Sequence, residues 1–319
     1  MLYRLTVYVG AVQTILALVE GSTPEIVAHQ RRPTDTIFDG RRSHGQALAD
    51  ALRDFLRENR VELSETMGVG VGVPGIVSRD GEQVISCPNL HELDGTWLGP
   101  DTASELGIPV FVSNNTNLIA LGEHSAGIGQ GVDDMAVVFV SSGVGSGLIL
   151  NGSLYQGTDG AAAEIGHTIV VQNGRLCSCG ARGCLEMYCS AKALSLVGEE
   201  LFEPEELSSL NTRFAGARLV IERALAGHSK ARQALSESFS YLGIALVNLV
   251  NLLNPQLIVL GGDIVFAWPE GVGIAQEVVK RETRPQARPN IRIEVSQLKN
   301  YAGVMGGAAL VTERLAHSH

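Results

Sequence analysis

Short apolar runs rich in β-branched residues recur along the chain and alternate with longer stretches of helical periodicity. Residues 2–10 and 14–20 are two such runs joined through a glycine turn, which predicts a β-hairpin. Residues 135–140 and 147–150 repeat this arrangement around the sequence SSGVGSG. Two strand–turn–strand openings of this kind, one in each half of the chain, indicate an internal duplication of the architecture.

Apolar positions between and after these hairpins predict further helices and strands. We expect helices at residues 43–59, 103–106, 117–125, 190–199, 213–226, 230–253 and 303–315, and strands at residues 67–73, 109–113, 256–260 and 291–295. The segment 230–253 has leucines at helical spacing, and we interpret this stripe as core packing. Strands that alternate with helices indicate an α/β fold.

Composition and charge narrow the class of protein. The 319 residues are 45% hydrophobic and 18% charged, which is typical of a soluble globular protein of two lobes or domains. A net charge of −10 argues against nucleic-acid binding by this chain and against attraction to anionic membranes. The N-terminus lacks the layout of a signal peptide, and no apolar run approaches the roughly 20 residues of a membrane span. We therefore expect a cytoplasmic protein.

A cluster of metal-binding residue types lies between positions 164 and 186, with the sequence EIGHTIVVQNGRLCSCGARGCLE. Cys177, Cys179 and Cys184 follow His167 by ten, twelve and seventeen residues. Three thiolates and one imidazole suit tetrahedral zinc. The alternative is a set of buried or disulfide-paired cysteines beside an unrelated histidine.

Two observations favour zinc over that alternative. Cys177 and Cys179 are too close in sequence to pair comfortably, and Gly180 and Gly183 supply the backbone freedom that a metal knuckle requires. The two other cysteines, Cys87 and Cys189, are then free thiols, which fits a reducing cytoplasm.

The motif G-H, nine residues, then C-x-C-G-x-x-G-C-x-E runs from Gly166 to Glu186 without a missing position. It resembles the signature of the ROK family (repressors, open reading frames and kinases). The resemblance implies an α/β, two-lobed, actin-like fold of the duplicated ribonuclease H type, as in sugar kinases, with a structural zinc at residues 167–184. It implies a smaller lobe at residues 1–116 plus 298–319 and a larger lobe at residues 117–297.

The resemblance also implies a sugar pocket made of polar groups from separate stretches. Carboxylates and side-chain amides suit vicinal hydroxyls, because they accept and donate hydrogen bonds at short range. The histidine of the motif is expected to bind zinc through one nitrogen and to face the sugar with the other. The two glutamates have a plainer interpretation, as carboxylates that merely support the motif or lie on the surface. The implied sugar-binding residues are Gly75, Asn89, Asn114, Asn115, Glu164, His167 and Glu186.

The catalytic base of the family's kinases is the Asp of an N-D-A-N motif, and the corresponding sequence here reads N-N-T-N. Asn115 occupies the position of that Asp. An amide has no basic site near neutral pH, and general-base catalysis is typically worth about 10²–10⁴ in rate. This substitution predicts severely impaired phosphoryl transfer.

The phosphate turns implied by the resemblance depart from the family pattern as well. In the first turn, Gly10 is kept while Tyr8 replaces the Asp that helps to hold Mg²⁺. In the second turn, Val144 replaces a threonine. Both departures argue against Mg-ATP as a working cofactor. The glycines that remain in the nucleotide turns are Gly10, Gly143, Gly145, Gly147, Gly261 and Gly262.

Three functions follow from these observations. The leading hypothesis is the sugar-sensing effector part of a ROK transcriptional regulator, acting as a homodimer or tetramer and without a DNA-binding module, since the chain begins directly at its first strand. The second is an ATP-dependent sugar kinase of the glucokinase or N-acetylhexosamine kinase type, with Glu164 as a substitute base. The third is a pseudokinase that acts by binding a protein partner. The identity of the sugar is not readable from these residues.

Overall fold

The computed structural model describes residues 2–210, 212–286 and 291–316. Contacts divide the chain into two compact units: the first contains Met1–Asp133, Gly147–Ala162 and Gln297–His319, and the second contains Asp134–Ser146 and Ala163–Ser296. The lobe boundary expected after residue 116 falls within helix α4 (Asn115–Ala126), and the whole of this helix lies in the first unit. The physical reason is that α4 packs along α12 (Ala302–Ala316), which belongs to the same unit.

The first five-stranded sheet has the strand order β3-β2-β1-β4-β7. Its strands are β1 (Tyr3–Val9), β2 (Gln13–Glu20), β3 (Glu25–Pro33), β4 (Thr66–Val73) and β7 (Val110–Asn114). The pairs β1–β2 and β2–β3 are antiparallel, whereas β4 pairs in parallel with both β1 and β7. The predicted N-terminal hairpin is confirmed.

The second five-stranded sheet has the order β10-β9-β8-β11-β12. Its strands are β8 (Met135–Val140), β9 (Val144–Leu150), β10 (Ser153–Tyr155), β11 (Leu257–Gly261) and β12 (Arg292–Val295). Numbered along the chain, the strands of each sheet follow the order 3-2-1-4-5. The internal duplication that the two glycine-turn hairpins predicted is therefore confirmed by the topology.

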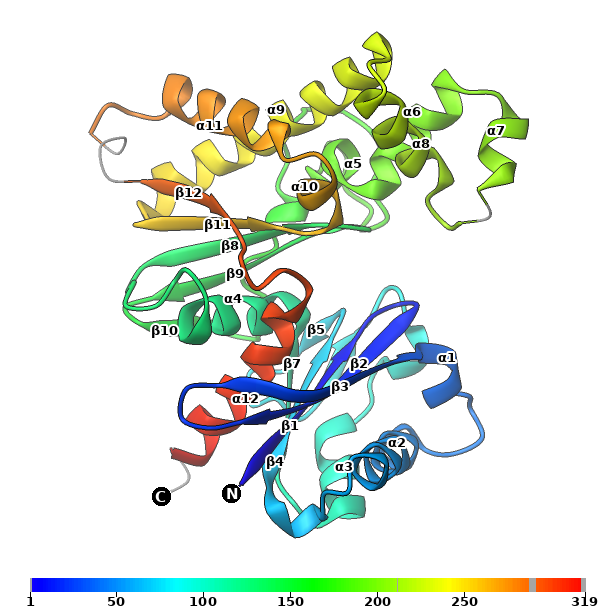
Figure 1. Cartoon of the computed structure of the whole chain (residues 1–319). Helices are drawn as coiled ribbons and strands as arrows, with labels where there is room; N and C mark the ends of the chain where they lie inside the picture. Colours follow the sequence, from blue (N-terminus) through cyan, green and yellow to red (C-terminus); the bar gives the residue numbers. More distant parts are fainter. Residues whose placement is uncertain (1, 211, 287–290, 317–319) are drawn as a thin grey trace. The chain divides into compact units, whose positions relative to one another are not determined.

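Two helices of the first unit pack in different ways. Helix α12 packs on its sheet through glycines, and helix α2 packs through an apolar face. The glycines of β4 allow one helix to approach closely: a Cβ on Gly70 would lie 2.2 Å from the carbonyl oxygen of Gly307 in α12. Figure 1 shows α12 beside α4 within this unit. On α2 (His44–Glu58), Leu48 and Leu52 belong to the hydrophobic core, and Ser43 caps the helix. The first unit also contains the short helix α1 (Thr34–Ile37) and helix α3 (Leu98–Leu106).

The second unit is mainly helical outside its strands. Its helices are α5 (Glu186–Cys189), α6 (Ala191–Leu201), α7 (Pro204–Ser209), α8 (Ala215–Leu225), α9 (Ser229–Leu253), α10 (Asp263–Ala267) and α11 (Glu270–Glu282). Among the described residues α9 is the one helix that is long and apolar enough to cross a membrane, but 56% of its apolar window is buried inside the structure. It packs against α11 and α8, as a core helix does.

The pattern of apolar residues located most elements to within a few residues. It missed β3, the small hairpin of β5 (Ile76–Val77) and β6 (Val84–Ser86), strand β10, and helices α1, α5, α7, α10 and α11. Strand β3 reads EIVAHQRRP and lies at the edge of its sheet, with no fully buried position among its described residues. A strand of this kind has little apolar signal, because sheet pairing rather than burial defines it.

Candidate functional site

The cysteine motif folds into a compact knuckle in the second unit. Two isolated bridges, Ile169 with Cys184 and Leu176 with Arg182, bring its ends together. The amide of Cys177 donates to the carbonyl of Ala181 at 2.8 Å. Gly180 and Gly183 have φ of +90° and +85°, a conformation that side chains other than glycine rarely adopt. The glycines at these two positions therefore have the backbone role that the sequence predicted.

The side chains of His167, Cys177, Cys179 and Cys184 converge, and their ligand atoms all lie within 4.8 Å of one another. The Sγ atoms of Cys179 and Cys184 are 3.6 Å apart, and Sγ of Cys177 is 3.7 Å from Nδ1 of His167. Tetrahedral zinc with Zn–S bonds of about 2.3 Å separates its sulfur ligands by roughly 3.8 Å, whereas a disulfide places them at about 2.05 Å. The three thiols and the imidazole are thus at separations that fit a tetrahedral metal ion. The described cysteines are free thiols.

Protonation of the thiols depends on their surroundings. Burial raises the pKa of Cys184 to about 12. A hydrogen bond from the backbone of Ala181 holds the pKa of the exposed Cys179 below its ordinary value. Since a metal ion binds thiolates, loading of the site releases protons, and the raised pKa of Cys184 makes its thiol a source of them.

The sugar-binding residues predicted in this unit lie next to the knuckle. Nδ1 of His167 faces Cys177, and its Nε2 lies 4.0 Å from Oε2 of Glu164. One ring nitrogen therefore faces the cysteine sulfurs and the other faces a carboxylate. That the second nitrogen also faces a sugar stays a prediction. Burial raises the pKa of Glu164, and the neighbouring Glu186 carboxylate raises it further, while His167 lowers it.

Glu186, the first residue of α5, reaches back to the turn between β8 and β9. Its Oε2 accepts a hydrogen bond from the amide of Val144 at 3.2 Å. The second predicted phosphate turn and the carboxylate that closes the cysteine motif are therefore in direct contact within the second unit.

The predicted residues of the first unit gather at the start of α4. Asn114 caps the helix, because its Oδ1 accepts from the amide of Thr116 at 2.7 Å, and its Nδ2 donates to the carbonyl of Gly75 at 2.8 Å. The buried Asn115 donates from Nδ2 to the carbonyl of Val9 at 2.8 Å. Its Oδ1 is buried with no hydrogen-bond partner among the described residues. Asn89 is exposed on a turn after β6.

The first glycine turn is short and closed by its own backbone. The amide of Gly10 donates to the carbonyl of Gln13 at 3.0 Å, and the hydroxyl of Thr34 donates to the carbonyl of Gly10 at 2.7 Å. Tyr8, at the expected position of a metal-binding Asp, packs its ring against α12: a Cβ on Gly303 would lie 2.3 Å from it. Tyr8 therefore serves the packing of the first unit.

The second phosphate turn contains a buried and an exposed side chain two residues apart. Val144 is the first residue of β9 and is 5% exposed. The exposed side chain on the turn itself is Ser142, which the sequence analysis overlooked. Gly147 lies within β9, where a Cβ would meet the carbonyl of Thr116 at 2.5 Å, so its role is packing against α4. The effect of Val144 on phosphate binding stays a prediction.

The predicted nucleotide turn at Gly261 and Gly262 ends β11. Gly262 has φ of +101°, and a Cβ there would lie 2.2 Å from the carbonyl of Val140. The next residue, Asp263, accepts a hydrogen bond at 2.5 Å from the hydroxyl of Ser141. This contact joins the two predicted nucleotide turns of the second unit. The sequence signal for it was a polar residue shortly after each strand, Ser141 after β8 and Asp263 after β11.

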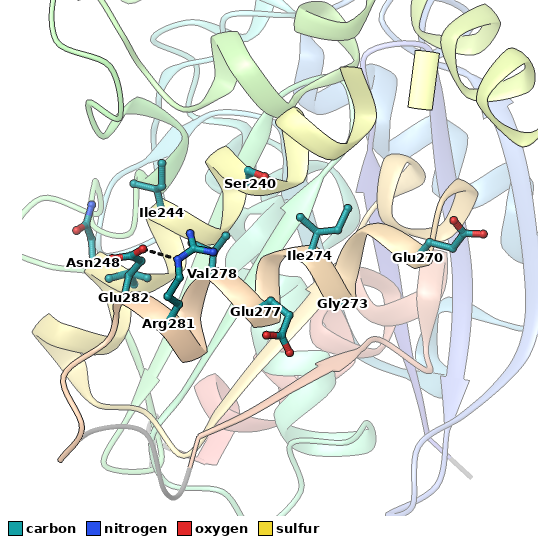
Figure 2. Close-up of a pocket in the computed structure, with 11 residues that line it drawn as sticks. Ser240, Ile244, Asn248, Glu270, Gly273, Ile274, Glu277, Val278, Arg281 and Glu282 are labelled. Carbon is teal, nitrogen blue, oxygen red and sulfur yellow. Dashed lines mark hydrogen bonds and ion pairs between the residues drawn. The ribbon is translucent and has the colours of Figure 1, made fainter. Parts of the chain in front are cut away.

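A groove of about 740 Å³ lies elsewhere in the second unit, between α9 and α11 (Figure 2). Figure 2 shows Ile244 and Ile274 on facing helices and an ion pair between Arg281 and Glu282. Its lining residues belong to these two helices, so none of the predicted site residues lines it.

Two α/β sheets of the same strand order, together with the knuckle and the glycine turns, define an actin-like ATPase fold of the sugar-kinase type. The ROK family model matches residues 4–314, and the chain belongs to the ROK family.

Its relatives include both enzymes and repressors. A glucokinase of Halalkalibacterium halodurans is 32% identical over 273 residues, which cover 84% of this chain and 82% of the enzyme. A xylose repressor of Caldicellulosiruptor bescii is 33% identical over 274 residues, covering 83% of this chain and 68% of the repressor. The crystal structure of a ROK glucokinase from Streptomyces griseus in complex with glucose and AMPPNP has a TM-score of 0.81 at 26% identity, covering 98% of this chain and 99% of that chain.

Proposed function

We propose that this chain is a sugar-binding, kinase-impaired ROK protein, and that it is the effector-sensing part of a sugar-responsive transcriptional regulator. The observation that carries the proposal is the amide of Asn115 at the position of the family's catalytic Asp. Its Nδ2 donates to the carbonyl of Val9, so the side chain is engaged in holding α4 to the end of β1. Because an amide takes up no proton near neutral pH, this position supplies no general base.

The sugar-binding part of the proposal rests on residues that the chain retains. Glu164, His167 and Glu186 lie near one another in the second unit, and Gly75, Asn114 and Asn115 lie together in the first. Carboxylates, an imidazole and amides are the groups that recognise vicinal hydroxyls. The relatives include a glucokinase and a xylose repressor, so we propose an aldose as the ligand class.

Zinc is the metal that the donor set favours. Three sulfurs and one imidazole nitrogen with tetrahedral separations and without a carboxylate ligand make a closed structural site. When bound, the ion would fix the imidazole of His167 and leave its Nε2 directed towards Glu164. We further propose a cytoplasmic location, since cysteines that form no disulfide suit a reducing compartment. A homodimer or tetramer is proposed from the family resemblance alone.

An ATP-dependent sugar kinase is the second candidate. The glucokinase relative and the glucose–AMPPNP complex of the Streptomyces griseus enzyme favour it, and so does the exposed Ser142 on the second turn. The doubt about Mg-ATP that Tyr8 and Val144 raised is not supported, since the similar ROK glucokinase structure contains AMPPNP. We therefore treat nucleotide binding and phosphoryl transfer as separate properties of this chain.

Calorimetry and a turnover assay separate the two candidates. D-Glucose and D-xylose are titrated into zinc-replete protein, and ADP release from Mg-ATP is followed with each sugar, with the Halalkalibacterium halodurans glucokinase assayed in parallel. We expect saturable binding of at least one sugar and turnover at least about 100-fold below the enzyme, since a missing base costs about 10²–10⁴. Turnover within about tenfold of the enzyme would make this chain a kinase, and no binding of either aldose would remove the proposed ligand class.

A further inference from the structure

Glu186 contacts the phosphate turn of the second unit at one defined point. Its Oε2 accepts the amide of Val144 at 3.2 Å. A Cβ built on Gly143 would lie 2.4 Å from the same oxygen, so the carboxylate lies directly against the turn. A carboxylate here uses a backbone donor of the kind that phosphate oxygens require.

The segment of the sugar motif also packs on the first residues of β9. A Cβ on Gly166 would lie 2.0 Å from the carbonyl of Val144, and the hydroxyl of Ser146 donates to the carbonyl of Ala163. The backbone around Val144 is therefore in contact with the sugar motif on one side and with the Glu186 carboxylate on the other.

The backbone around Glu186 is held by two hydrogen bonds. The hydroxyl of Ser190 donates to the carbonyl of Glu186 at 2.6 Å, and the amide of Ala191 donates to the carbonyl of Ser141 at 2.8 Å. These two bonds fix the start of α5 and α6 relative to the turn. An exchange of the hydrogen-bond partner of the Glu186 carboxylate therefore requires only rotation of the side chain, while the backbone at the start of α5 and α6 stays in place.

We propose that Glu186 is a positioning residue that couples sugar binding to phosphate binding in this chain, an inference that rests on the proposed sugar site. Without sugar, its carboxylate holds the amide of Val144. A sugar hydroxyl that donates to the same carboxylate draws it off the turn. The freed amide then donates to a phosphate oxygen of a nucleotide.

The sign of this coupling follows from charge. A carboxylate and a phosphate repel each other and compete for one donor, so sugar binding strengthens phosphate binding by removing the competitor. Linkage requires the reverse effect to have the same size: nucleotide must strengthen sugar binding by the same factor.

The experiment measures the affinity for Mg-AMPPNP by calorimetry, with and without saturating D-glucose or D-xylose, in zinc-replete protein. We expect sugar to tighten Mg-AMPPNP binding about tenfold in the wild type, within the usual range of coupling between sites. Glu186→Gln should bind Mg-AMPPNP more tightly than the wild type without sugar and should show a coupling factor near one. Glu199→Gln is the matched control, because it makes the same change at an exposed glutamate on α6. This variant should behave like the wild type.

Gly143→Ala tests the contact while keeping the Glu186 charge. The added Cβ displaces the flexible end of Glu186, and Gly143 does not use the left-handed backbone region, so the turn tolerates alanine. The coupling factor should again fall towards one. A merely structural role of Glu186 would change stability or sugar affinity and leave this factor unaltered.

Two results would overturn the inference. One is a sugar-free Mg-AMPPNP affinity that is the same in Glu186→Gln and the wild type, a comparison that needs no sugar ligand. The other is an absence of Mg-AMPPNP binding to both proteins at millimolar concentration. Failure of the sugar site itself appears separately, as flat sugar titrations of the wild type, and leaves the sugar-free comparison to decide the role of Glu186.

Discussion

The knuckle of the second unit and the start of α4 in the first unit both gather polar side chains of the ROK motifs, yet these side chains differ in what they contact. In the knuckle, the sulfur and imidazole atoms point at one another, with a sulfur–sulfur separation of 3.6 Å between Cys179 and Cys184. At the start of α4, the amides of Asn114 and Asn115 donate to backbone carbonyls of Gly75 and Val9.

This difference separates a site whose side chains need a ligand from a site whose side-chain amides bind the backbone of the fold. Four metal-ligating atoms at tetrahedral spacing are stabilised by a cation, because deprotonated sulfurs repel one another without one. The asparagine amides instead hold strand ends to a helix. An amide at position 115 is therefore compatible both with the fold and with the four candidate metal ligands of the knuckle.

The largest effect should come from the knuckle. Cys179→Ser should remove bound zinc and lower stability by about 3 kcal/mol, a shift in Tm of roughly 6–12 °C for a unit of this size. Metal analysis and differential scanning calorimetry measure both quantities. Cys189→Ser, which changes a buried cysteine outside the cluster, should keep full metal content. Full zinc content in Cys179→Ser would remove that residue from the ligand set.

An intermediate effect is expected from Asn115→Asp. The carboxylate cannot donate to the carbonyl of Val9 and is buried, which costs about 1–3 kcal/mol in the free energy of unfolding. Burial raises the pKa of the new carboxyl in the folded protein above its value in the unfolded protein. The ionisation-dependent loss in the free energy of unfolding is therefore absent below the unfolded pKa. It grows as the pH rises and is complete above the folded pKa.

Urea unfolding of Asn115→Asp at pH 5 and pH 8 tests that prediction. The deficit relative to the wild type should be smaller at pH 5. Asn248→Asp on the exposed side of α9 is the control and should show little change at either pH. An unchanged stability of Asn115→Asp, accompanied by strong kinase turnover, would mean that the position still accommodates a catalytic carboxylate.

The smallest effect should come from Asn114→Ala. Loss of the cap of α4 costs about 1 kcal/mol, because the amide of Thr116 loses its acceptor. Asn114→Ser keeps a capping oxygen and should recover most of that loss while it still lacks the donor to Gly75. Chemical denaturation of both variants measures the difference, and equal stability of the two would show that the bond to Gly75 dominates.

The sequence by itself determined the architecture and the metal-binding set. Alternating strands and helices, two glycine-turn hairpins and the gapped motif from Gly166 to Glu186 were sufficient for the duplicated α/β fold and for all four ligand residues. These features are local: a hydrophobic period, a turn glycine and a short cysteine spacing act within a few tens of residues.

Tertiary structure decided which of the remaining residues face a ligand. Val144 and Ser142 are two positions apart, yet one is buried in β9 and the other is exposed on the turn. The contact of Glu186 with Val144 joins residues 42 positions apart, and that of Asn115 with Val9 joins residues 106 apart. Such contacts depend on how strands and helices pack, because the direction of a side chain follows from the position where its strand begins and from which element covers it.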